Sequence, residues 1–311
     1  MNPHQLKYMK KKKRITLNGI FYAILSSASF GFSPLFSLGL ITVGLTNFDI
    51  LSYRWGIAGI VLMIYAFCKK KTLLPSSWDE TRKIILLSAL RSITSVTLLI
   101  GYANISSGIA STINFMYPVI VALCMMFFFG EHKSLVDIGA IGVSIFGVYL
   151  LASGDSLVVP GGDTTLGLTC SLISAFSFAA YYILMKRLRA DKIEVVKFTT
   201  WVMMLSAVYF IACALVFEGR LNMIPDGKSW LYILGLALWS TMISNFTGVK
   251  AVRRIGPTLT SILGALQPVT AVILGVAFLN EHLYFRSLIG ITLILVAVTV
   301  VVMHQNTRKH H

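Results

Sequence analysis

The stretch that decides the fold is Ser111-Thr-Ile-Asn-Phe-Met-Tyr-Pro118-Val119, which returns later in the chain as Ser261-Ile-Leu-Gly-Ala-Leu-Gln-Pro268-Val269. Each copy is followed, after a run rich in apolar residues, by a Glu-His pair that begins at Glu131 and at Glu281. Six positions match, and every matching pair is 150 residues apart. A constant spacing of this kind indicates an internal repeat.

Two more pairs of segments repeat in the same order, at a spacing of 148 residues. Residues 19–30 and 167–178 carry Gly, Ser, Ser and Phe at matching positions, and Ala89-Leu90-Arg91-Ser92 corresponds to Ala237-Leu238-Trp239-Ser240. The two extra residues fall in the connection that ends at Pro257. One match can arise by chance, whereas three matches in one order predict a duplicated chain.

The composition places this repeat in a membrane. Of 311 residues, 56% are hydrophobic and only 13% are charged, whereas soluble domains carry about 25% charged residues. A soluble protein cannot cover that much apolar surface with polar groups, so a cytosolic enzyme, a disordered chain and a secreted disulfide domain are excluded. A bilayer span needs about 20 apolar residues, and ten such runs are present: 18–39, 47–67, 84–103, 108–129, 135–152, 165–185, 198–217, 229–249, 258–279 and 287–303.

The positive charges predict the orientation of these spans. The net charge of +15 would suggest nucleic acid on a soluble protein. Here 22 of the 27 basic residues fall on one side of the predicted topology, three fall on the other, and Arg54 and Arg91 lie inside spans. Because basic loops stay cytoplasmic, we expect an inner (plasma) membrane protein with both termini, 1–17 and 304–311, in the cytoplasm.

The lysine-rich start of the chain is interpreted as an anchor at anionic lipid, so no nucleic-acid partner is expected. The first span continues into the bundle and lacks a clear small-residue cleavage site, so we do not expect a cleaved signal peptide.

Two repeats of five spans each, 18–152 and 165–303, cross the membrane in opposite directions because five is odd. The predicted fold is therefore an all-α membrane protein with ten transmembrane helices in two inverted five-helix repeats. Inverted repeats are typical of secondary transporters, whose substrate binds near the midplane between the halves. The alternative is a channel or a non-transporting membrane scaffold, although the ring of one polar residue type that a channel favours is not visible.

The same segments resemble the EamA family, a ten-helix branch of the drug/metabolite transporter superfamily. The similarity rests on Ser52-Tyr-Arg54, on Gly101-Tyr-Ala103, and on the pattern Pro118…Gly130-Glu131, which returns as Gly256…Pro268…Asn280-Glu281. It covers about residues 18–303 and departs from the family at Asn280, where glycine commonly precedes the glutamate. The resemblance implies export or exchange of small organic metabolites, often amino acids.

Polar and aromatic side chains inside the spans are the candidates for a substrate cavity, since polar groups are costly in lipid and face the protein interior. Tyr117 and Gln267 stand out because each precedes the proline of its repeat. Phe30 and Phe178 lie on stripes of small residues, for which helix packing is an equally good explanation. The predicted lining residues, suited to a small zwitterionic or amphipathic solute, are Phe30, Arg91, Asn114, Tyr117, Phe178, Trp239 and Gln267.

Four residues are candidate hinges or gates. Pro118 and Pro268 lie near the middle of their spans, where each removes one backbone hydrogen bond. Either a kink that gates the cavity or a kink without function accounts for them. Glu131 and Glu281 fall at helix ends, as gate or capping groups.

The two arginines inside spans have different predicted roles. Arg91 is expected roughly 10 Å inside the cytoplasmic boundary, at 1.5 Å per residue. It can bind a substrate carboxylate, or it can pair with a carbonyl or snorkel. Arg54 is predicted to be structural, with Asp49 about one turn away as its partner.

The remaining chemistry-bearing residues do not indicate an enzyme. Asp and Glu are absent from the span centres, so the sequence does not support proton coupling. The four cysteines show no C-x-x-C spacing, the histidines near helix ends show no metal-ligand spacing, and no phosphate-binding glycine loop is present. We therefore expect no cofactor and no metal. The expected partners are a small-molecule substrate and the lipid bilayer, and a homodimer stays open.

Overall fold

The computed structural model describes residues 3–105, 107–129, 135–152, 161–278 and 285–307. Helices and connecting turns account for these residues, with no β-strand among them. The helices of the first repeat are α1 (Pro3–Phe30), α2 (Ser33–Ile41), α3 (Asn47–Cys68), α4 (Trp78–Asn104), α5 (Ser107–Asn114), α6 (Tyr117–Phe129) and α7 (Leu135–Ala152). Those of the second are α8 (Thr164–Arg187), η1 (Ala190–Lys192), α9 (Val195–Cys213), η2 (Ala214–Glu218), α10 (Gly227–Leu234), η3 (Gly235–Ile243), α11 (Ser244–Leu263), α12 (Leu266–Phe278) and α13 (Phe285–Thr307).

Each of the ten predicted spans corresponds to one helix or to helices that follow one another directly. In the described part of the chain, six helical stretches are long and apolar enough to cross a bilayer: 16–41, 47–68, 78–104, 164–187, 195–218 and 227–263. Three of the other four spans contain the shorter apolar helices Tyr117–Phe129, Ile138–Gly147 and Leu288–Ala297. The fourth, 258–279, consists of the end of α11 followed by α12. The protein is an all-α membrane protein, as the sequence predicts.

The spans predicted over 108–129 and 258–279 are broken, where the sequence predicts only kinks. Helix α6 begins at Tyr117, three residues after α5 ends, and α12 begins at Leu266, three residues after α11 ends. The proline of each repeat is the second or third residue of the new helix, where its missing N–H removes no helical hydrogen bond. The two breaks therefore occupy equivalent places in the repeats.

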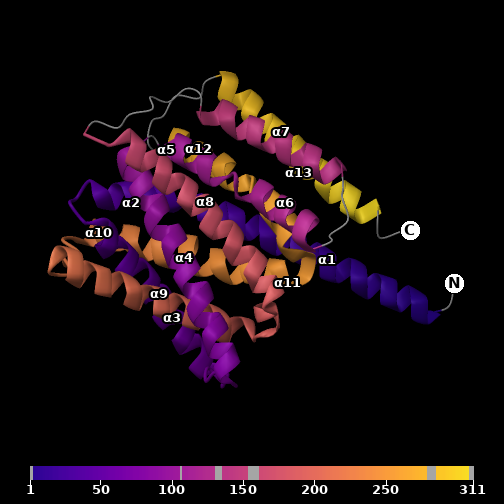
Figure 1. Cartoon of the computed structure of the whole chain (residues 1–311), viewed down its shortest axis with the longest axis horizontal. Coiled ribbons are helices and arrows are strands. Elements are labelled where there is room, and N and C mark those ends of the chain that lie inside the picture. Colours follow the sequence, from indigo (N-terminus) through magenta and orange to yellow (C-terminus); the bar gives the residue numbers. More distant parts are fainter. Residues whose placement is uncertain (1–2, 106, 130–134, 153–160, 279–284, 308–311) are drawn as a thin grey trace.

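The helix pairings carry the symmetry of the duplication. The most extensive ones join α1 to α11, α4 to α8, α3 to α9, and α7 to α13. Exchanging the two repeats swaps the first pairing with the second and leaves the other two unchanged. Figure 1 shows one of these unchanged pairs, α7 and α13, side by side along an edge of the bundle.

Glycines at matching positions let the exchanged pairs approach closely. A Cβ on Gly19 of α1 would lie 2.5 Å from the Ile255 side chain on α11, and a Cβ on Gly167 of α8 would lie 2.7 Å from Ile105 at the end of α4. The hydrophobic effect does not drive helix association in lipid. Small residues at such crossings let the helices come close enough for van der Waals packing to hold them together. The glycine match that reveals the repeat is therefore a packing requirement.

Serine hydroxyls join the same pairs. The Oγ of Ser26 donates to the backbone carbonyl of Ser244, at 2.7 Å, and thereby links α1 to α11. The Oγ of Ser174 donates to the carbonyl of Thr94, at 3.0 Å, and links α8 to α4. Ser26 and Ser174 are equivalent in the repeat, so both halves use a serine at this position to bond the backbone of the helix it pairs with.

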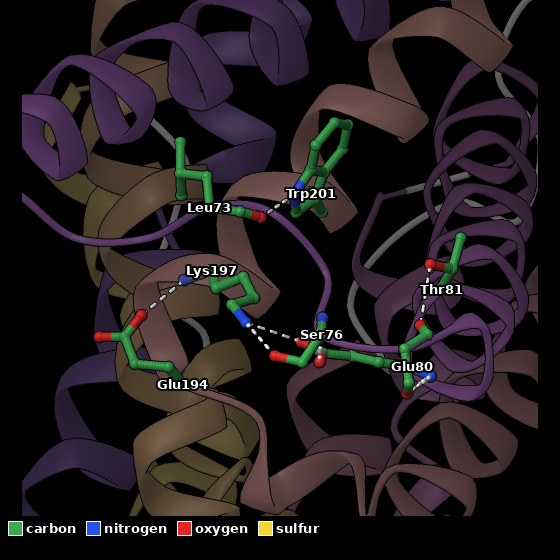
Figure 2. A network of polar contacts seen from close by, with 8 residues as sticks. Leu73, Ser76, Glu80, Thr81, Glu194, Lys197 and Trp201 are labelled. Atoms are coloured by element: carbon green, nitrogen blue, oxygen red, sulfur yellow. Dashed lines mark hydrogen bonds and ion pairs between the residues drawn. The ribbon is translucent and has the colours of Figure 1, made fainter.

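One end of the bundle is held by polar contacts between the α3–α4 connection and the start of α9 (Figure 2). The Lys197 ammonium lies 3.2 Å from both Glu80 Oε1 and Ser76 Oγ, and the Trp201 indole N–H donates to the carbonyl of Leu73, at 2.7 Å. Burial disfavours the ionised carboxylate of Glu194, but hydrogen bonds, the first from the Lys71 side chain, outweigh this and lower its pKa. These contacts anchor a connection that the sequence predicts on the basic side.

Candidate functional site

A cavity of about 400 Å³, a volume that includes the solvent space it opens to, lies between the two repeats. Its walls come from α1, α4 and α6 of the first repeat and from α8, α11 and α12 of the second. The lining residues are mostly aromatic or small and polar: Ser26, Ser27, Phe30, Arg91, Tyr117, Phe178, Tyr181, Tyr182, Ser244, Asn245, Gly248, Val249 and Gln267. We refer to it as the larger cavity.

Packed aromatic rings form one wall of the larger cavity. The Tyr117 ring lies 4.6 Å from that of Phe178 and 5.9 Å from that of Tyr182, measured between centroids. The Phe178 and Tyr182 rings are 4.8 Å apart. Rings in mutual contact lose little side-chain freedom when a ligand stacks on them, so this wall is a preformed surface for an apolar or aromatic group.

The helix breaks bring Tyr117 and Gln267 to this cavity. Tyr117 is the first residue of α6, and its hydroxyl donates to the carbonyl of Ser261, at 3.3 Å, in the last turn before the other break. There is room for this hydroxyl only because residue 264 is glycine: a Cβ at Gly264 would overlap the Tyr117 oxygen. Gln267 bonds back through its N–H to the Gly264 carbonyl, at 2.9 Å. The two breaks thus face each other.

Arg91 of α4 reaches the larger cavity with only 2% of its surface exposed. Its Nε donates to Asn245 Oδ1, at 2.9 Å, and Asn245 is held in turn by a bond from its Nδ2 to the Thr241 carbonyl, at 2.8 Å. The guanidinium carbon lies 4.7 Å from the Phe178 ring centroid and 5.5 Å from that of Trp55. Its Nη1 has no hydrogen-bond partner among the described residues.

A second space, the smaller cavity, has an empty volume of about 280 Å³. It shares Phe30 and Arg91 with the larger cavity, so these two side chains stand between the two spaces. Its lining residues come from α1 to α4 of the first repeat: Phe30, Ser33, Arg54, Arg91, Thr94, Ser95, Leu98, Leu99 and Tyr102.

Arg54 lines the smaller cavity and does not pair with Asp49, contrary to the sequence prediction. Its Nε donates to Thr241 Oγ1 and its Nη1 donates to Ser33 Oγ, at 3.1 Å, while Nη2 has no partner in the described part of the chain. Asp49 accepts hydrogen bonds from the backbone N–H and side chain of Asn222, at 2.9 and 2.8 Å, and it also completes the cap of α3. The carboxylate is therefore fully used in holding the α9–α10 connection.

Five of the seven predicted lining residues surround the larger cavity, and two lie elsewhere. Asn114 is buried at the end of α5, where its Oδ1 accepts a bond from Ser174 Oγ, at 2.9 Å, so it ties α5 to α8. Trp239 is 42% exposed and its ring packs edge-on against Phe32, at 6.0 Å. It belongs to the π-helical segment η3 and does not line the cavity that its sequence position predicts.

Of the four predicted hinge or gate residues, Pro118 and Pro268 are buried and follow the two helix breaks. Glu131 and Glu281 lie outside the described residues. Within the described ranges, no group of three His, Cys, Asp or Glu residues is close enough to hold a metal ion.

Several cavity residues share a helix face that the sequence prediction did not select as a unit. Phe178, Tyr181 and Tyr182 recur at i, i+3 and i+4 on α8, and Asn245, Gly248 and Val249 recur in the same way on α11. This spacing places three residues on one face of a helix. A search for polar or aromatic faces, rather than for single residues, identifies both groups.

The comparisons with known proteins show the family and the division of the chain into two matched segments. The sequence model described as "EamA-like transporter family" matches residues 17–153 and again residues 165–303. The chain belongs to the EamA-like transporter family. Both matches together span most of the chain, and their division falls in the same connection that separates the two sequence repeats.

Individual relatives of this EamA chain are distant. It is 23% identical to the uncharacterised transporter YetK of Bacillus subtilis, over 80% of this chain and 76% of the relative. It is 24% identical to the uncharacterised inner membrane transporter YedA of Escherichia coli K12, over 80% and 79% of the two chains. Protein PecM of Dickeya dadantii is also 24% identical, over 78% and 79%. A crystal structure with 17% identity superposes with a TM-score of 0.76, over 94% of this chain and 97% of the other, which shows a shared fold.

Proposed function

We propose that this membrane transporter moves small organic metabolites, such as amino acids, out of the cell by alternating access between its two repeats. The observation that supports this most directly is the larger cavity, which draws its walls from both repeats and is lined by a residue that follows each helix break, Tyr117 and Gln267. A break in each half gives each half a place where it can bend, and a cavity between the halves opens to one side or the other as they rock.

The proposal also assigns the orientation. The connections α3–α4 and α8–α9, rich in lysine and arginine, face the cytoplasm together with both termini, as the charge distribution favours. The larger cavity lies toward the basic side of the bundle, since Tyr182 is one helical turn before Lys186 at the end of α8, and Gly248 is two residues before Lys250 on α11. Substrate therefore enters the larger cavity from the cytoplasmic side.

Counterflow in liposomes tests this function. The purified chain is reconstituted into vesicles preloaded with one unlabelled amino acid at a time, and uptake of the same radiolabelled amino acid is followed. We expect saturable uptake that the preloaded solute accelerates, because a carrier returns faster when it is loaded. Flux that stays proportional to concentration without acceleration contradicts the proposal and favours a channel.

The aromatic wall gives a matched pair of variants. Tyr117→Ala removes a cavity ring, whereas Tyr149→Ala removes a ring that is 59% exposed on α7. We expect Tyr117→Ala to lower counterflow about tenfold, equivalent to about 1.4 kcal/mol, and Tyr149→Ala to leave it unchanged. Expression and the elution volume of the purified protein are measured for both. Wild-type counterflow in Tyr117→Ala contradicts its placement at the substrate.

A further inference from the structure

Two arginines inside the bundle have no carboxylate partner. Arg54 and Arg91 are 4% and 2% exposed. In the described part of the chain, all four ion pairs involve lysines near helix ends, and every hydrogen-bond partner of the two guanidinium groups is neutral. A buried charge without a counter-ion is strongly unfavourable. Such an arrangement is typical of a site whose counter-ion arrives with a ligand.

The free donors of both arginines belong to the cavities. Arg91 lines the larger and the smaller cavity and leaves Nη1 without a hydrogen bond, while Arg54 lines the smaller cavity and leaves Nη2 without one. Because protein groups already satisfy Nε of each side chain, the guanidinium groups are fixed in place before a ligand binds.

The aromatic rings around Arg91 leave the in-plane N–H groups of its guanidinium available to a ligand. The rings of Phe30, Trp55 and Phe178 lie within 5.6 Å of the guanidinium carbon, which is the distance range of cation–π contact. Rings cover the faces of a guanidinium and cannot accept its in-plane N–H bonds. An oxyacid group can accept them, because the planar fork of arginine matches two carboxylate oxygens.

Among the described residues, neither cavity presents a carboxylate that could pair with a cationic cargo. No Asp or Glu is among the lining residues of either cavity, so an amine cargo would meet two positive charges and no negative one. We propose that the cargo carries a carboxylate, which Arg91 binds in the larger cavity and Arg54 binds in the smaller one. This inference rests on the proposed transport function and narrows its substrate class.

Matched ligands test it on the purified full chain. The unfolding midpoint is measured in detergent with phenylacetate, phenylacetamide and phenethylamine, then with alanine and alaninamide, and with chloride alone. We expect the carboxylates to raise the midpoint by about 2–4 °C at saturation, and the amides and amines to leave it unchanged. A shift by amides or amines as large as that by acids, or no acid-dependent shift across the panel, overturns the inference. An equal shift by chloride alone shows an inorganic anion site only and also overturns it.

Variants separate binding from structure. Arg91→Gln is expected to abolish the acid-dependent shift without lowering the midpoint of the ligand-free protein, and Arg91→Lys to keep part of the shift because it keeps the charge but not the fork. Arg54→Gln is expected to retain the shift and to slow counterflow of the same acids. Arg82→Gln, at an exposed position of the same helix as Arg91, is the control and should behave as wild type. An acid-dependent shift that survives in Arg91→Gln overturns the assignment of Arg91.

Failure of the inference and failure of transport are distinguishable. If only amides or amines show counterflow, the protein is a transporter and the carboxylate inference is wrong. If the acids stabilise the wild type through Arg91 but no solute shows counterflow, the binding site stands and the proposed transport function is wrong.

Discussion

At the scale of single residues, Gly264 decides the shape of the site. It has no side chain, and the Tyr117 hydroxyl occupies the space that a Cβ would fill. This contact joins the start of α6 to the end of α11, and therefore joins the break of one repeat to the break of the other. A single methyl group added at residue 264 is therefore expected to displace Tyr117 and so to disturb both repeats.

We predict that Gly264→Ala lowers the free energy of unfolding by about 1–3 kcal/mol, the range for an overpacked interior site, and reduces counterflow by displacing Tyr117. The control is Gly142→Ala, a glycine of α7 with open space around its Cβ position. Unfolding is followed by circular dichroism in detergent. Equal stability of the two variants contradicts the steric role of Gly264.

The sequence identifies some site residues and misses the partners of others. Tyr117 and Gln267 were predictable because each precedes a proline at an equivalent place in the repeat. The partner of Arg54 was not, because Thr241 is 187 residues away and meets it only through the packing of α3 against η3. Asp49 is near in sequence but is fully engaged by Asn222 and the helix cap. Local spacing does not show such competition for one carboxylate.

At the scale of helices, the connection between the eighth and ninth predicted spans depends on Gly256. Its φ of 84° and ψ of 169° interrupt α11 just before Pro257. This backbone conformation is essentially restricted to glycine, and Pro257 then starts a new helical segment with a preset φ. The interruption, rather than a long loop, turns the chain from the eighth span into the ninth.

We predict that Gly256→Ala lowers stability by about 1–3 kcal/mol, because alanine is strained at this φ and ψ. Gly227→Ala, at the start of α10 and with open space around it, serves as the control and should be nearly neutral. Thermal unfolding of both purified variants gives the comparison. A wild-type midpoint for Gly256→Ala would show that the turn tolerates a different backbone conformation.

The anchor between the α3–α4 connection and α9 gives a second prediction at this scale. Lys197→Met keeps an unbranched side chain that is one heavy atom shorter and removes its charge. The Glu80 carboxylate then loses a partner at 3.2 Å in a place where both side chains are almost buried. We expect a loss of about 3 kcal/mol. The exposed Lys192→Met is the control. Urea unfolding of the reconstituted protein measures the difference, and equal stabilities would show that the ion pair contributes nothing.

The helices themselves were largely predictable, since ten apolar runs of span length leave few alternatives. Their interruptions were not. Proline marks where a helix can break. Whether it breaks or only kinks depends on whether a neighbouring helix offers contacts to the residues at the interruption, as the Ser261 carbonyl does to the Tyr117 hydroxyl. That information lies in the partner repeat, 144 residues away.

At the scale of the whole molecule, exchanging the repeats converts two of the four main helix pairings into each other and leaves the other two unchanged. The sequence already contains this symmetry in its matched glycines and serines, and this is why the fold could be predicted to the level of repeats. The orientation in the membrane comes from charge alone, and it needs an experiment of its own.

We predict that a cysteine at residue 192 reacts only with reagent on the cytoplasmic side, and a cysteine at residue 228 only with reagent on the other side. Residues 192 and 228 are both exposed and lie at opposite ends of the second repeat. Lys192→Cys and Lys228→Cys are each introduced into a chain whose four native cysteines are replaced. Labelling of intact cells with a membrane-impermeant maleimide is compared with labelling of lysed cells. The reverse pattern contradicts the proposed topology.

The two arginines without a carboxylate partner also bear on the energy source for transport. Moving one elementary charge through 100 mV involves about 2.3 kcal/mol of electrical work. For a monoanionic acid leaving a cell whose interior is negative, this work favours departure and corresponds to about a 50-fold concentration ratio. A protein that neutralises such a cargo with Arg91 and Arg54, and that places no carboxylate among its cavity residues, can let the resting voltage drive release without a co-transported proton.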